Sequence, residues 1–309
     1  MSTRLAVILP VYNGMPYLPE AVESILRQSF IDFTFIIVND GSTDGTREYL
    51  DALRDPRIVL INQANAGQGS ARNTALRSCR SEYVALMDAD DISHPERFRF
   101  QLDYLDSHPD VVMLGTQFEC LVGDVAQRAL TLPADHHGIE TRLLKGQAGL
   151  CNTSLMFRNT AASSCGGYPD GFVGEDIDFC LRMCEQGHVA NLARVLIQYR
   201  MHPTQTSLTK YRQLISATHY AAHRAICRRK GLPEPELNRF IRNASLFTRW
   251  RWAAEAQAVI QYRMGRIRIA GGKPVEGILR LALSGICRPF TTIRRVAGTI
   301  ETLLRGQAN

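Results

Sequence analysis

Residues 5–40 read LAVILPVYNGMPYLPEAVESILRQSFIDFTFIIVND and set the pattern for the first part of the chain. A short apolar run, Leu5–Val11, is followed by apolar positions at helical spacing over Leu18–Gln28. A second apolar run, Thr34–Asn39, comes next. Continuous apolar runs of this length are typical of strands buried on both faces of a sheet. We therefore expect a strand–helix–strand unit whose parallel strands are joined by a right-handed crossover.

The same alternation continues to residue 105 and predicts an α/β fold. The apolar runs Ile58–Asn62 and Tyr83–Met87 predict two more strands. Helical spacing recurs in three segments, which are Thr46–Leu53, Gln68–Ser78 and Pro95–Leu105. Pro95 suits the first turn of the last of these helices, because its fixed φ angle is compatible with a helix start.

After residue 110 the pattern changes to that of a mixed sheet or of hairpins. Four segments have the composition of strands: Val111–Gly115, Gln117–Val122, Thr153–Phe157 and Val195–Tyr199. Glu175–Gln186 predicts one helix, ended by Gly187. From Leu208 onward the pattern is almost wholly helical, so we expect a helical extension after the α/β domain.

The composition is that of a soluble globular protein. Of the 309 residues, 45% are hydrophobic and 21% are charged, which excludes collagen-like, disordered and disulfide-scaffold classes. No apolar run approaches the roughly 20 residues needed to span a bilayer. The eight cysteines include no Cys-x-x-Cys pair, so we expect reduced, buried thiols. These features predict a cytoplasmic protein and leave attachment to a membrane surface open.

Charge is divided unevenly along the chain. Residues 1–209 carry 17 Lys and Arg against 25 Asp and Glu, whereas residues 210–309 carry 19 against 5. Within the basic part, Gly277–Pro289 and Ile293–Leu304 mix apolar residues with arginine at helical spacing, as in amphipathic helices on anionic membranes. We expect these helices to hold the protein at the inner membrane face. The alternative is a basic helical subdomain packed on the core, and no recognised nucleic-acid-binding module is present.

Polar segments follow four of the expected strands, at the point where each strand ends. They are Tyr12-Asn13-Gly14, Asp40-Gly41-Ser42, Asn65-Ala66-Gly67 and Asp88-Ala89-Asp90-Asp91. In open parallel sheets, ligands bind beyond the carboxyl ends of the strands. Two of these segments carry carboxylates, so the sequence predicts a polar ligand site at this edge of the sheet.

Asp88-Ala89-Asp90-Asp91 is the strongest single feature. An Asp-x-Asp pair at a strand end can direct two carboxylates toward one Mg²⁺ or Mn²⁺, and such ions commonly bridge a carboxylate to substrate phosphates. Asp40 can accept hydrogen bonds from a nucleobase or a ribose. Arg72 lies in the first turns of the glycine-rich helix start at Asn65–Asn73, a good position for holding a diphosphate.

Two other nucleotide-binding classes do not fit. No Gly-x-Gly-x-x-Gly follows the first strand, which argues against a Rossmann dehydrogenase. A nucleotidyltransferase needs a glycine-rich, Lys- or Arg-bearing triphosphate loop at that place. The segment Tyr12-Asn13-Gly14-Met15-Pro16 does not supply such a loop.

Six ordered motifs together resemble the family-2 glycosyltransferases with the GT-A fold. They are Pro10-Val11-Tyr12-Asn13-Gly14, Asn39-Asp40-Gly41-Ser42-Thr43-Asp44, Asn65–Asn73, Asp88-Ala89-Asp90-Asp91, Gly174-Glu175-Asp176 and Tyr199-Arg200-Met201-His202. The resemblance implies a Rossmann-like mixed sheet, mostly parallel, with helices on both faces, in a catalytic domain at 1–209. Residues 210–309 would form a separate basic helical region. The implied reaction is transfer of a sugar from a nucleotide diphospho-sugar to a hydroxyl group, with inversion at the anomeric carbon.

The resemblance also implies a donor site made of seven residues. Asp40 would bind the nucleobase, and Arg72 would contact the diphosphate or the nucleotide. Asp88 would lie near the ribose. The remaining members form the lip of the nucleoside pocket and the position after Asp88: Pro10, Tyr12, Asn13 and Ala89.

For the metal, the resemblance implies Mn²⁺ or Mg²⁺ bound by Asp90. His202 would approach the same metal or the diphosphate. Asp91 is a spare carboxylate that leaves the assignment within the cluster open, and Gln205 would belong to a closing loop.

For the chemistry, the resemblance implies that Asp176 is the general base. Inversion requires a base on the face opposite the leaving diphosphate, and such a base works best with a pKa near the operating pH. Glu175 is the alternative to Asp176.

The donor nucleotide is expected to be UDP, on family frequency alone. The acceptor is expected to be a lipid-linked or growing surface glycan, while the donor sugar, the linkage and the oligomeric state stay open. A non-catalytic nucleotide-sugar-binding or scaffold protein with the same fold is the alternative. The presence of both Asp90 and Asp176 argues against it, because a binding module has no need of a base.

Overall fold

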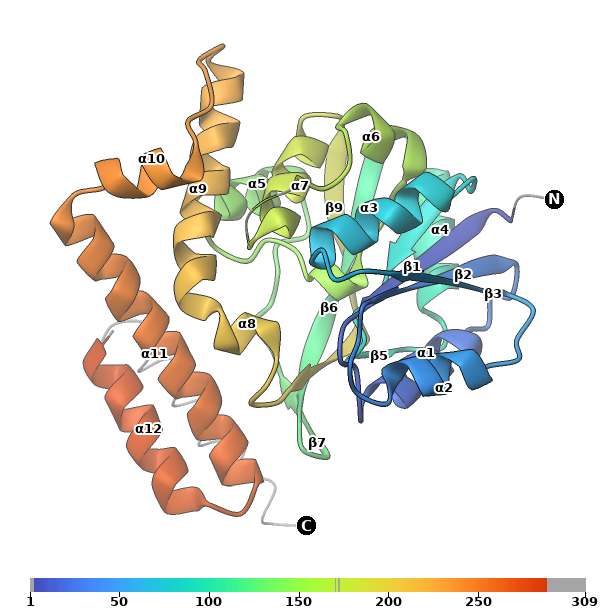
Figure 1. Ribbon diagram of the computed structural model, residues 1–309. Helices are drawn as coiled ribbons and strands as arrows, with labels where there is room; N and C mark the ends of the chain where they lie inside the picture. The colour runs from blue at the N-terminus through green and yellow to red at the C-terminus, as the bar shows by residue number, and fades with distance from the viewer. Residues whose placement is uncertain (1–2, 170, 172, 288–309) are drawn as a thin grey trace.

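The computed structural model describes residues 3–169, 171 and 173–287. Within these residues, the centre of the molecule is a nine-stranded sheet in the order β3-β2-β1-β4-β8-β6-β9-β5, with β7 paired to β6 (Figure 1). Helices cover both faces of this sheet, and a group of later helices extends from one side (Figure 1). The predicted α/β class with a C-terminal helical extension is confirmed.

The first half of the chain forms the parallel part of the sheet. β1 lies between β2 and β4, β2 also pairs with β3, and all three pairings are parallel. The strands and helices of this half are β1 (Leu5–Val11), α1 (Leu18–Leu26), β2 (Phe33–Asp40), α2 (Thr46–Ala52), β3 (Ile58–Gln63), α3 (Gln68–Ser78), β4 (Tyr83–Leu86) and α4 (Arg97–Ser107). Each agrees with its predicted range to within two residues at either end. Pro95 lies just before α4 rather than in its first turn, because the helix begins after Glu96.

The second half adds the mixed part of the sheet. Its elements are β5 (Ile92–Ser93), β6 (Val111–Val122), β7 (Val125–Arg128), α5 (His136–Leu144), β8 (Met156–Arg158), α6 (Asn159–Ser164), α7 (Glu175–Cys184) and β9 (His188–Met201). β8 runs antiparallel between β4 and β6, whereas β6 and β9 are parallel. The sheet is therefore mixed, as expected.

Two strand predictions in this half were wrong. Val111–Gly115 and Gln117–Val122 form one strand, because Thr116 continues β6 and the irregularity there is absorbed by register shifts against β9. Thr153–Phe157 is divided, because Asn152–Ser154 forms a short 3₁₀ turn before β8 begins. Both differences arise from pairing partners that are distant in sequence.

β9 is longer than predicted, and four short elements were not predicted. Only its apolar part, Val195–Tyr199, has the composition of a buried strand, and the preceding exposed Arg194 interrupts that pattern. The elements that were not predicted are β5, β7, α5 and α6. β5 has two residues and β7 has four, which is too short for hydrophobic periodicity to indicate a strand.

The C-terminal part is helical, as predicted from Leu208 onward. Its helices are α8 (Thr206–Thr209), α9 (Tyr211–Arg229), α10 (Leu237–Asn243), α11 (Leu246–Ala270) and α12 (Pro274–Cys287). α9 packs against α7, and α11 and α12 form an antiparallel hairpin (Figure 1). The predicted amphipathic segment Ile293–Leu304 and the end of Gly277–Pro289 lie outside the described residues. Among the described residues, no helix is both long and apolar enough to cross a bilayer.

Alternate residues of β1 pack on opposite faces of the sheet, which explains its unbroken apolar run. Ala6 and Ile8 belong to a core shared with α3, α5, α7 and α9. Leu5, Val7 and Leu9 belong to a second core with α1 and α4. The strands are therefore packed on both faces. Because β1, β2 and β4 are parallel neighbours, the loops that follow them lie at the same edge of the sheet. The eight cysteines are free, and six of them are buried, as expected.

Candidate active site

The loop after β2 is organised by Asp40. Its Oδ1 accepts hydrogen bonds from Gln63 Nε2 at 2.7 Å and from the Ala66 N–H at 2.9 Å. Its Oδ2 accepts from the Gly67 N–H at 2.9 Å. Gly41 allows the close approach, since it has φ of +74° and an added Cβ would lie 2.7 Å from the Asn65 nitrogen. Asp40 therefore shapes the start of α3, and its contact with a nucleobase stays a prediction.

The loop after β1 is tied to the same region. The Asn13 N–H donates to Ser42 Oγ at 2.9 Å, and Asn13 Oδ1 accepts from the Thr43 N–H at 2.8 Å. Asn13 has φ of +52°, a conformation that asparagine tolerates better than most residues. Pro10 is buried in β1, whereas Tyr12 is 52% exposed. Of the predicted lip residues, Asn13 is thus bound directly to the loop that follows Asp40.

Arg72 of α3 connects two predicted parts of the site. It is 2% exposed, and its Nη1 lies 3.0 Å from Glu175 Oε1 while its Nη2 lies 3.2 Å from Asp88 Oδ1. The Tyr168 ring lies against the guanidinium, with 5.3 Å from Arg72 Cζ to the ring centroid. Asp88, Arg72 and Glu175 therefore form one ion-pair chain between the end of β4 and the start of α7, in which Arg72 and Glu175 are buried and Asp88 is partly buried.

Asp176 is the second residue of α7, two residues after Gly174, whose φ of +96° requires glycine. Its Oδ1 accepts from the Ile177 N–H at 2.9 Å. Burial, and then the nearby Glu175, raise the pKa of Asp176 to about 6. Glu175 is differently placed, because one oxygen binds Arg72 and the other accepts from the Gly174 N–H at 3.0 Å. Of the two candidates, Asp176 is the one with an oxygen that makes no hydrogen bond to the described residues.

The rest of the acidic cluster contacts the end of β9. His202 Nε2 lies 2.9 Å from Asp90 Oδ2, and His202 Nδ1 lies 2.9 Å from Thr204 Oγ1. Asp91 is buried, and its Oδ1 accepts from the Arg200 N–H at 2.8 Å. Burial, together with Asp90 and Asp88, raises the pKa of Asp91 well above its usual range. Ala89, between Asp88 and Asp90, is partly buried against the sheet core.

Gln205 fixes the turn that carries His202. Its Oε1 accepts from the His202 N–H at 2.9 Å, and its Nε2 donates to Ser207 Oγ at 2.7 Å. The His202 ring also packs against Tyr17, with 4.5 Å between the ring centroids. The predicted closing-loop residue is buried in this structure, and it orients the backbone beside the imidazole.

The side chains of Asp90 and His202 fit a divalent cation. Carboxylate oxygen and imidazole nitrogen are suitable ligands for Mn²⁺, and the contact with Thr204 orients the ring. Within the part of the chain that the structure describes, no three His, Cys, Asp or Glu side chains converge as a metal-binding group. With a divalent cation bound, these two residues would supply part of the coordination shell, and substrate phosphates and water would supply the rest.

Four polar atoms around Asp88 are buried without a hydrogen-bond partner among the described residues: Arg72 Nε, Asp91 Oδ2, Asn152 Oδ1 and Tyr168 hydroxyl. Buried polar groups in folded proteins are nearly always hydrogen-bonded, to protein or to water. Such a concentration of unpartnered groups beside an ion-pair chain is typical of a ligand site. The position of the donor stays a prediction.

The sequence interpretation missed four residues of this site. Asn152 Nδ2 lies 3.4 Å from Asp88 Oδ2, and Thr153 Oγ1 accepts from the Asp88 N–H at 3.1 Å. Tyr168 covers Arg72, and Arg200 holds Asp91. Arg200 is part of a quoted motif, but no role was assigned to it. The other three lie in segments without a motif, so no signal in a single sequence indicates them.

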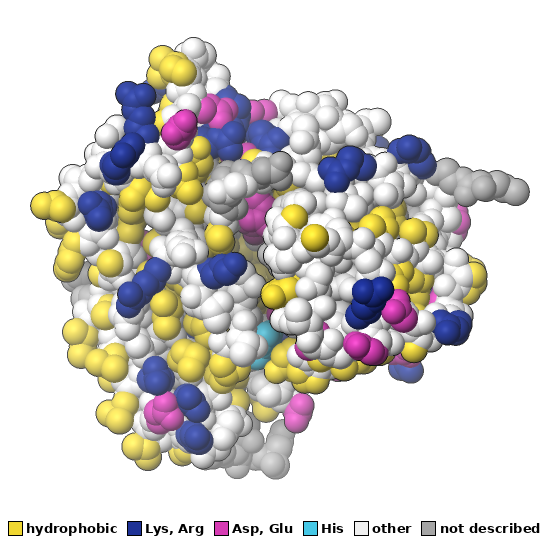
Figure 2. Space-filling model, viewed as in Figure 1, with side chains coloured by type: hydrophobic (Ala, Val, Ile, Leu, Met, Phe, Trp, Pro, Cys, Tyr) yellow, Lys and Arg dark blue, Asp and Glu magenta, His cyan; other side chains and the backbone are white. Residues whose placement is uncertain are grey.

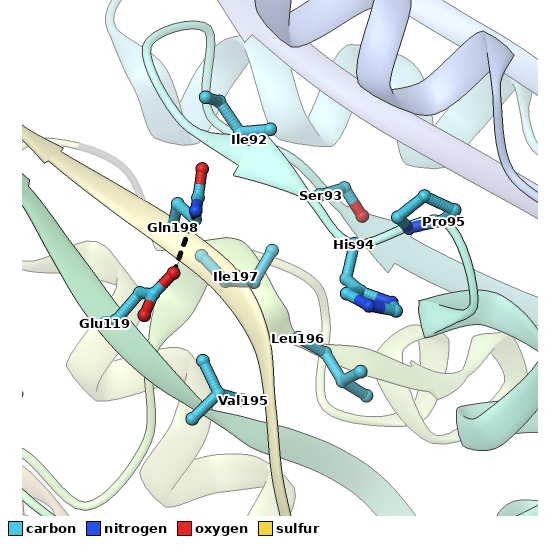
Figure 3. Close-up of a pocket in the computed structure, with 9 residues that line it drawn as sticks. All are labelled: Ile92, Ser93, His94, Pro95, Glu119, Val195, Leu196, Ile197 and Gln198. Carbon is cyan, nitrogen blue, oxygen red and sulfur yellow. Dashed lines mark hydrogen bonds between the residues drawn. The ribbon is translucent and has the colours of Figure 1, made fainter. Parts of the chain in front are cut away.

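A pocket of about 190 Å³ lies elsewhere, between β5 and β9 (Figure 3). It is lined by Ile92, Ser93, His94, Pro95, Glu119, Val195, Leu196, Ile197 and Gln198. Gln198 Nε2 donates to Glu119 Oε1 at 2.8 Å, as the dashed line in Figure 3 shows. None of the predicted site residues lines this pocket, so it is separate from the candidate active site.

Comparison with known proteins identifies the family. Residues 6–165 match the sequence model of glycosyl transferase family 2. An uncharacterised glycosyltransferase of Haemophilus influenzae is 30% identical over 223 residues, which cover 66% of this chain and 67% of that protein. The chain belongs to glycosyltransferase family 2. The predicted resemblance is confirmed.

Other family-2 relatives include proteins of polysaccharide synthesis. The amylovoran biosynthesis glycosyltransferase AmsE of Erwinia amylovora is 31% identical over 206 residues, which cover 63% of this chain and 75% of AmsE. In two further curated relatives, the matched segment makes up 27% and 30% of the protein's length.

Solved structures confirm the GT-A type of fold for this family-2 chain. The mannosyltransferase PcManGT of Pyrobaculum calidifontis, solved with GDP-Man and Mn²⁺, has a TM-score of 0.58 at 17% identity, covering 98% of this chain and 88% of that one. Residues 1–349 of S. aureus TarS, solved with UDP-GlcNAc, have a TM-score of 0.57 at 17% identity, covering 93% and 91%. At this identity the likeness concerns the fold alone.

Proposed function

We propose that this family-2 chain transfers a sugar from a UDP-sugar to a hydroxyl group of a glycan or lipid-linked glycan, with inversion at the anomeric carbon. Synthesis of a cell-surface polysaccharide, as in the name of AmsE, is the proposed context. The observation that carries the proposal is Asp176, a carboxylate with a pKa raised to about 6, beside unpartnered buried polar atoms at the carboxyl edge of the sheet.

Asp176 acts in this proposal as the general base. The acceptor oxygen attacks the anomeric carbon, its proton passes to Asp176, and the bond from that carbon to the diphosphate breaks. A base with a pKa of about 6 is ionised at neutral pH and still accepts a proton readily. Glu175 acts indirectly, because its ion pair with Arg72 positions the start of α7.

The donor is held by the loops after β1, β2 and β4. Asp40, Asn13 and Tyr12 surround the nucleoside, and Arg72 Nε supplies an unpartnered donor toward the diphosphate. A divalent cation held by Asp90 and His202, when bound, supplies positive charge that stabilises the leaving nucleoside diphosphate. PcManGT was solved with Mn²⁺, which supports Mn²⁺ or Mg²⁺ as the ion used here.

The proposed catalytic domain is residues 1–209, and residues 210–309 are the proposed membrane-associating region. The proposed location is the cytoplasmic face of the membrane, where a lipid-linked acceptor is accessible. The support is the contrast in charge, since residues 210–309 carry 19 Lys and Arg against 5 Asp and Glu. An anionic lipid surface attracts such a segment.

A donor screen tests the proposal. The full-length protein is incubated with a panel of nucleotide sugars, Mn²⁺ and membrane lipid extract, and nucleoside diphosphate release is measured together with glycolipid product. We expect release with a UDP-sugar that depends on the lipid extract, and a loss of at least about 100-fold in Asp176→Asn.

The matched control is Asp51→Asn, an exposed carboxylate of α2 that pairs with Arg47 on the helix surface. This variant should turn over at the wild-type rate. Transfer by Asp176→Asn at the wild-type rate would overturn the assignment of the base. Donor binding without any transfer, across the whole panel, would instead favour a binding protein.

A further inference from the structure

One face of α12 is apolar and exposed along its whole length. Val275, Ile278, Leu279, Leu283 and Ile286 are each between 49% and 77% exposed, and Ala282 between them is exposed as well. Their spacing of three and four residues places them on one side of the helix. The opposite side, with Gly277 and Leu281, is buried against α11. We call the exposed face the α12 stripe.

The α11–α12 hairpin is closely packed and connected to the sheet. The exposed apolar side chains therefore lie on a helix with a fixed position. An added Cβ at Gly277 would lie 2.7 Å from the Gly265 carbonyl oxygen, which shows how closely the two backbones approach. Ser284 Oγ donates to the Ala258 carbonyl at 2.8 Å. Arg266 of α11 binds Gln127 of β7, so the hairpin is also connected to the sheet.

The first turn of α11 adds exposed aromatic and basic side chains. Leu246, Phe247 and Trp250 are exposed, Trp250 at 65%, and the Phe247 and Trp250 rings stack with 6.0 Å between centroids. Arg249 and Arg251 beside them are exposed too. Of the 17 large apolar side chains exposed in the described residues, eight belong to α11 and α12.

The charge of this region is mainly positive. Residues 246–287 contain seven Lys and Arg but only Glu255 and Glu276 as acids. Figure 2 shows yellow side chains along the edge of the molecule formed by α11 and α12, with dark-blue basic side chains next to them. Monomeric soluble proteins rarely leave a continuous apolar surface of this kind uncovered.

We propose that the α12 stripe and the first turn of α11 lie on an anionic lipid bilayer. Exposed aliphatic residues insert at the boundary of head groups and acyl chains, Trp250 suits the interface, and the arginines contact lipid phosphates. α12 has 14 residues, or about 21 Å of helix, so it lies in the plane of the membrane and does not span it.

A second copy of this chain fits the same surface less well. Self-association through this face would bring two surfaces with an excess of basic side chains together, and like charges oppose such an interface. An anionic membrane satisfies both properties, because it buries the apolar stripe and neutralises the arginines. This inference rests on the membrane association proposed above for residues 210–309 and names the face that carries it, and membrane binding itself requires no sugar transfer.

Vesicle binding tests the inference in the absence of donor and acceptor. The full-length protein is sedimented with vesicles of phosphatidylcholine alone or of phosphatidylcholine with phosphatidylglycerol at 3:1. We expect binding to the anionic vesicles, and at least a tenfold weaker apparent affinity for the double variant Leu279→Glu with Leu283→Glu. The matched control is Ile31→Glu with Val59→Glu, two exposed apolar positions on the sheet domain that receive the same added charge.

A second readout does not depend on the glutamate variants. Brominated lipids in the anionic vesicles should quench tryptophan fluorescence in the wild-type protein, and Trp250→Phe should remove most of that quenching. Trp252 remains as an internal control, because its ring stacks on His219 and Phe240 within the helical region.

Three outcomes overturn the inference. One is equal vesicle binding by the α12 variant and its control, combined with no quenching of Trp250. Another is a dimer in solution that becomes monomeric in the α12 variant without change in vesicle binding, which assigns the face to self-association. The third is equal binding to neutral and anionic vesicles. By contrast, a protein that binds vesicles but transfers no sugar would contradict only the proposed transfer reaction.

Discussion

Asp176 differs from the other carboxylates of the site in what surrounds it. Arg72 binds Glu175 and Asp88, His202 contacts Asp90, and the backbone at Arg200 binds Asp91. Asp176 accepts only from its own helix start among the described residues, at the Ile177 N–H. Burial and the neighbouring Glu175 therefore raise its pKa, with Arg72 opposing them.

The raised pKa predicts how activity depends on pH. Asp176 accepts a proton only when it is ionised, so kcat/KM should be constant above about pH 7. It should fall about tenfold for each pH unit below the pKa of about 6. The measurement is transfer rate at low donor concentration between pH 4.5 and 8, with donor affinity followed by calorimetry over the same range. A constant rate down to pH 5 would contradict the role of Asp176.

Arg72 is expected to matter for stability as well as for the donor. In Arg72→Met, the buried Glu175 and the partly buried Asp88 lose their shared cation, which should cost about 3 kcal/mol, the lower end of the range for a broken buried ion pair. Urea unfolding should show this loss in the free energy of unfolding. Arg47→Met is the control, because Arg47 pairs with Asp51 on the surface of α2 and should change the free energy by less than about 1 kcal/mol.

His202 is expected to affect metal binding directly. His202→Ala removes one of the two proposed ligands, and we expect Mn²⁺ affinity, measured by calorimetry with UDP present, to fall at least about tenfold. His108→Ala serves as the control, since His108 stacks on Tyr104 at the exposed end of α4. Unchanged Mn²⁺ affinity in His202→Ala would place the ion elsewhere.

α7 is anchored to the helical region through Asp178, two residues after the proposed base. Asp178 is fully buried, with Oδ2 at 2.8 Å from Arg182 Nε and Oδ1 at 3.1 Å from Arg224 Nη1. Arg228 of α9 lies slightly further, at 3.7 Å. The side chain of Asp178 therefore joins α7 to α9.

Asp178→Asn should loosen this connection between elements. Three arginines then lose a buried carboxylate, so the free energy of unfolding should fall by about 3 kcal/mol or more. The matched control is Asp110→Asn, an exposed carboxylate whose partner is His188, with an expected change of less than about 1 kcal/mol. Chemical denaturation of both variants provides the measurement, and equal stability would show that α9 does not hold α7.

For the molecule as a whole, the acidic and basic parts of the chain correspond to two different proposed roles, sugar transfer and membrane attachment. The acidic part, 1–209, contains the carboxylates of the site, and the basic part contains the exposed apolar stripe of α12. The proposed membrane attachment therefore combines two different forces, one electrostatic and one hydrophobic. They respond differently to salt.

Salt should weaken vesicle binding without abolishing it. Between 50 mM and 500 mM NaCl the Debye length falls from about 14 Å to about 4 Å, so attraction between exposed arginines and lipid phosphates is screened. We expect the affinity for anionic vesicles to fall several-fold and then level off, because burial of the α12 stripe is insensitive to screening. Complete loss of vesicle binding at high salt would show that the attachment depends on charge alone.

Local patterns were enough to predict much of the fold. The apolar runs of β1 to β4 and the spacing of α1 to α4 are local properties, because strands buried on both faces show unbroken apolar sequence. The strand-end motifs were also readable, since parallel strands bring their carboxyl ends to one edge. This arrangement predicted Asp40, Asp88 and Asp90 as site residues, and the resemblance to family 2 added Asp176 and His202; their roles stay predictions.

Pairings between distant segments required the tertiary structure. Arg72 pairs with both Asp88 and Glu175 because α3, β4 and α7 meet in the fold. Tyr168 and Asn152 lie at the same place, and neither belongs to a sequence motif. The length of β6 and β9 depends on their mutual register. Amphipathic spacing showed that the α12 segment has an apolar face, but only its packing on α11 shows which face stays exposed. Contacts between residues far apart in sequence arise from the packed chain, and for that reason no local pattern encodes them.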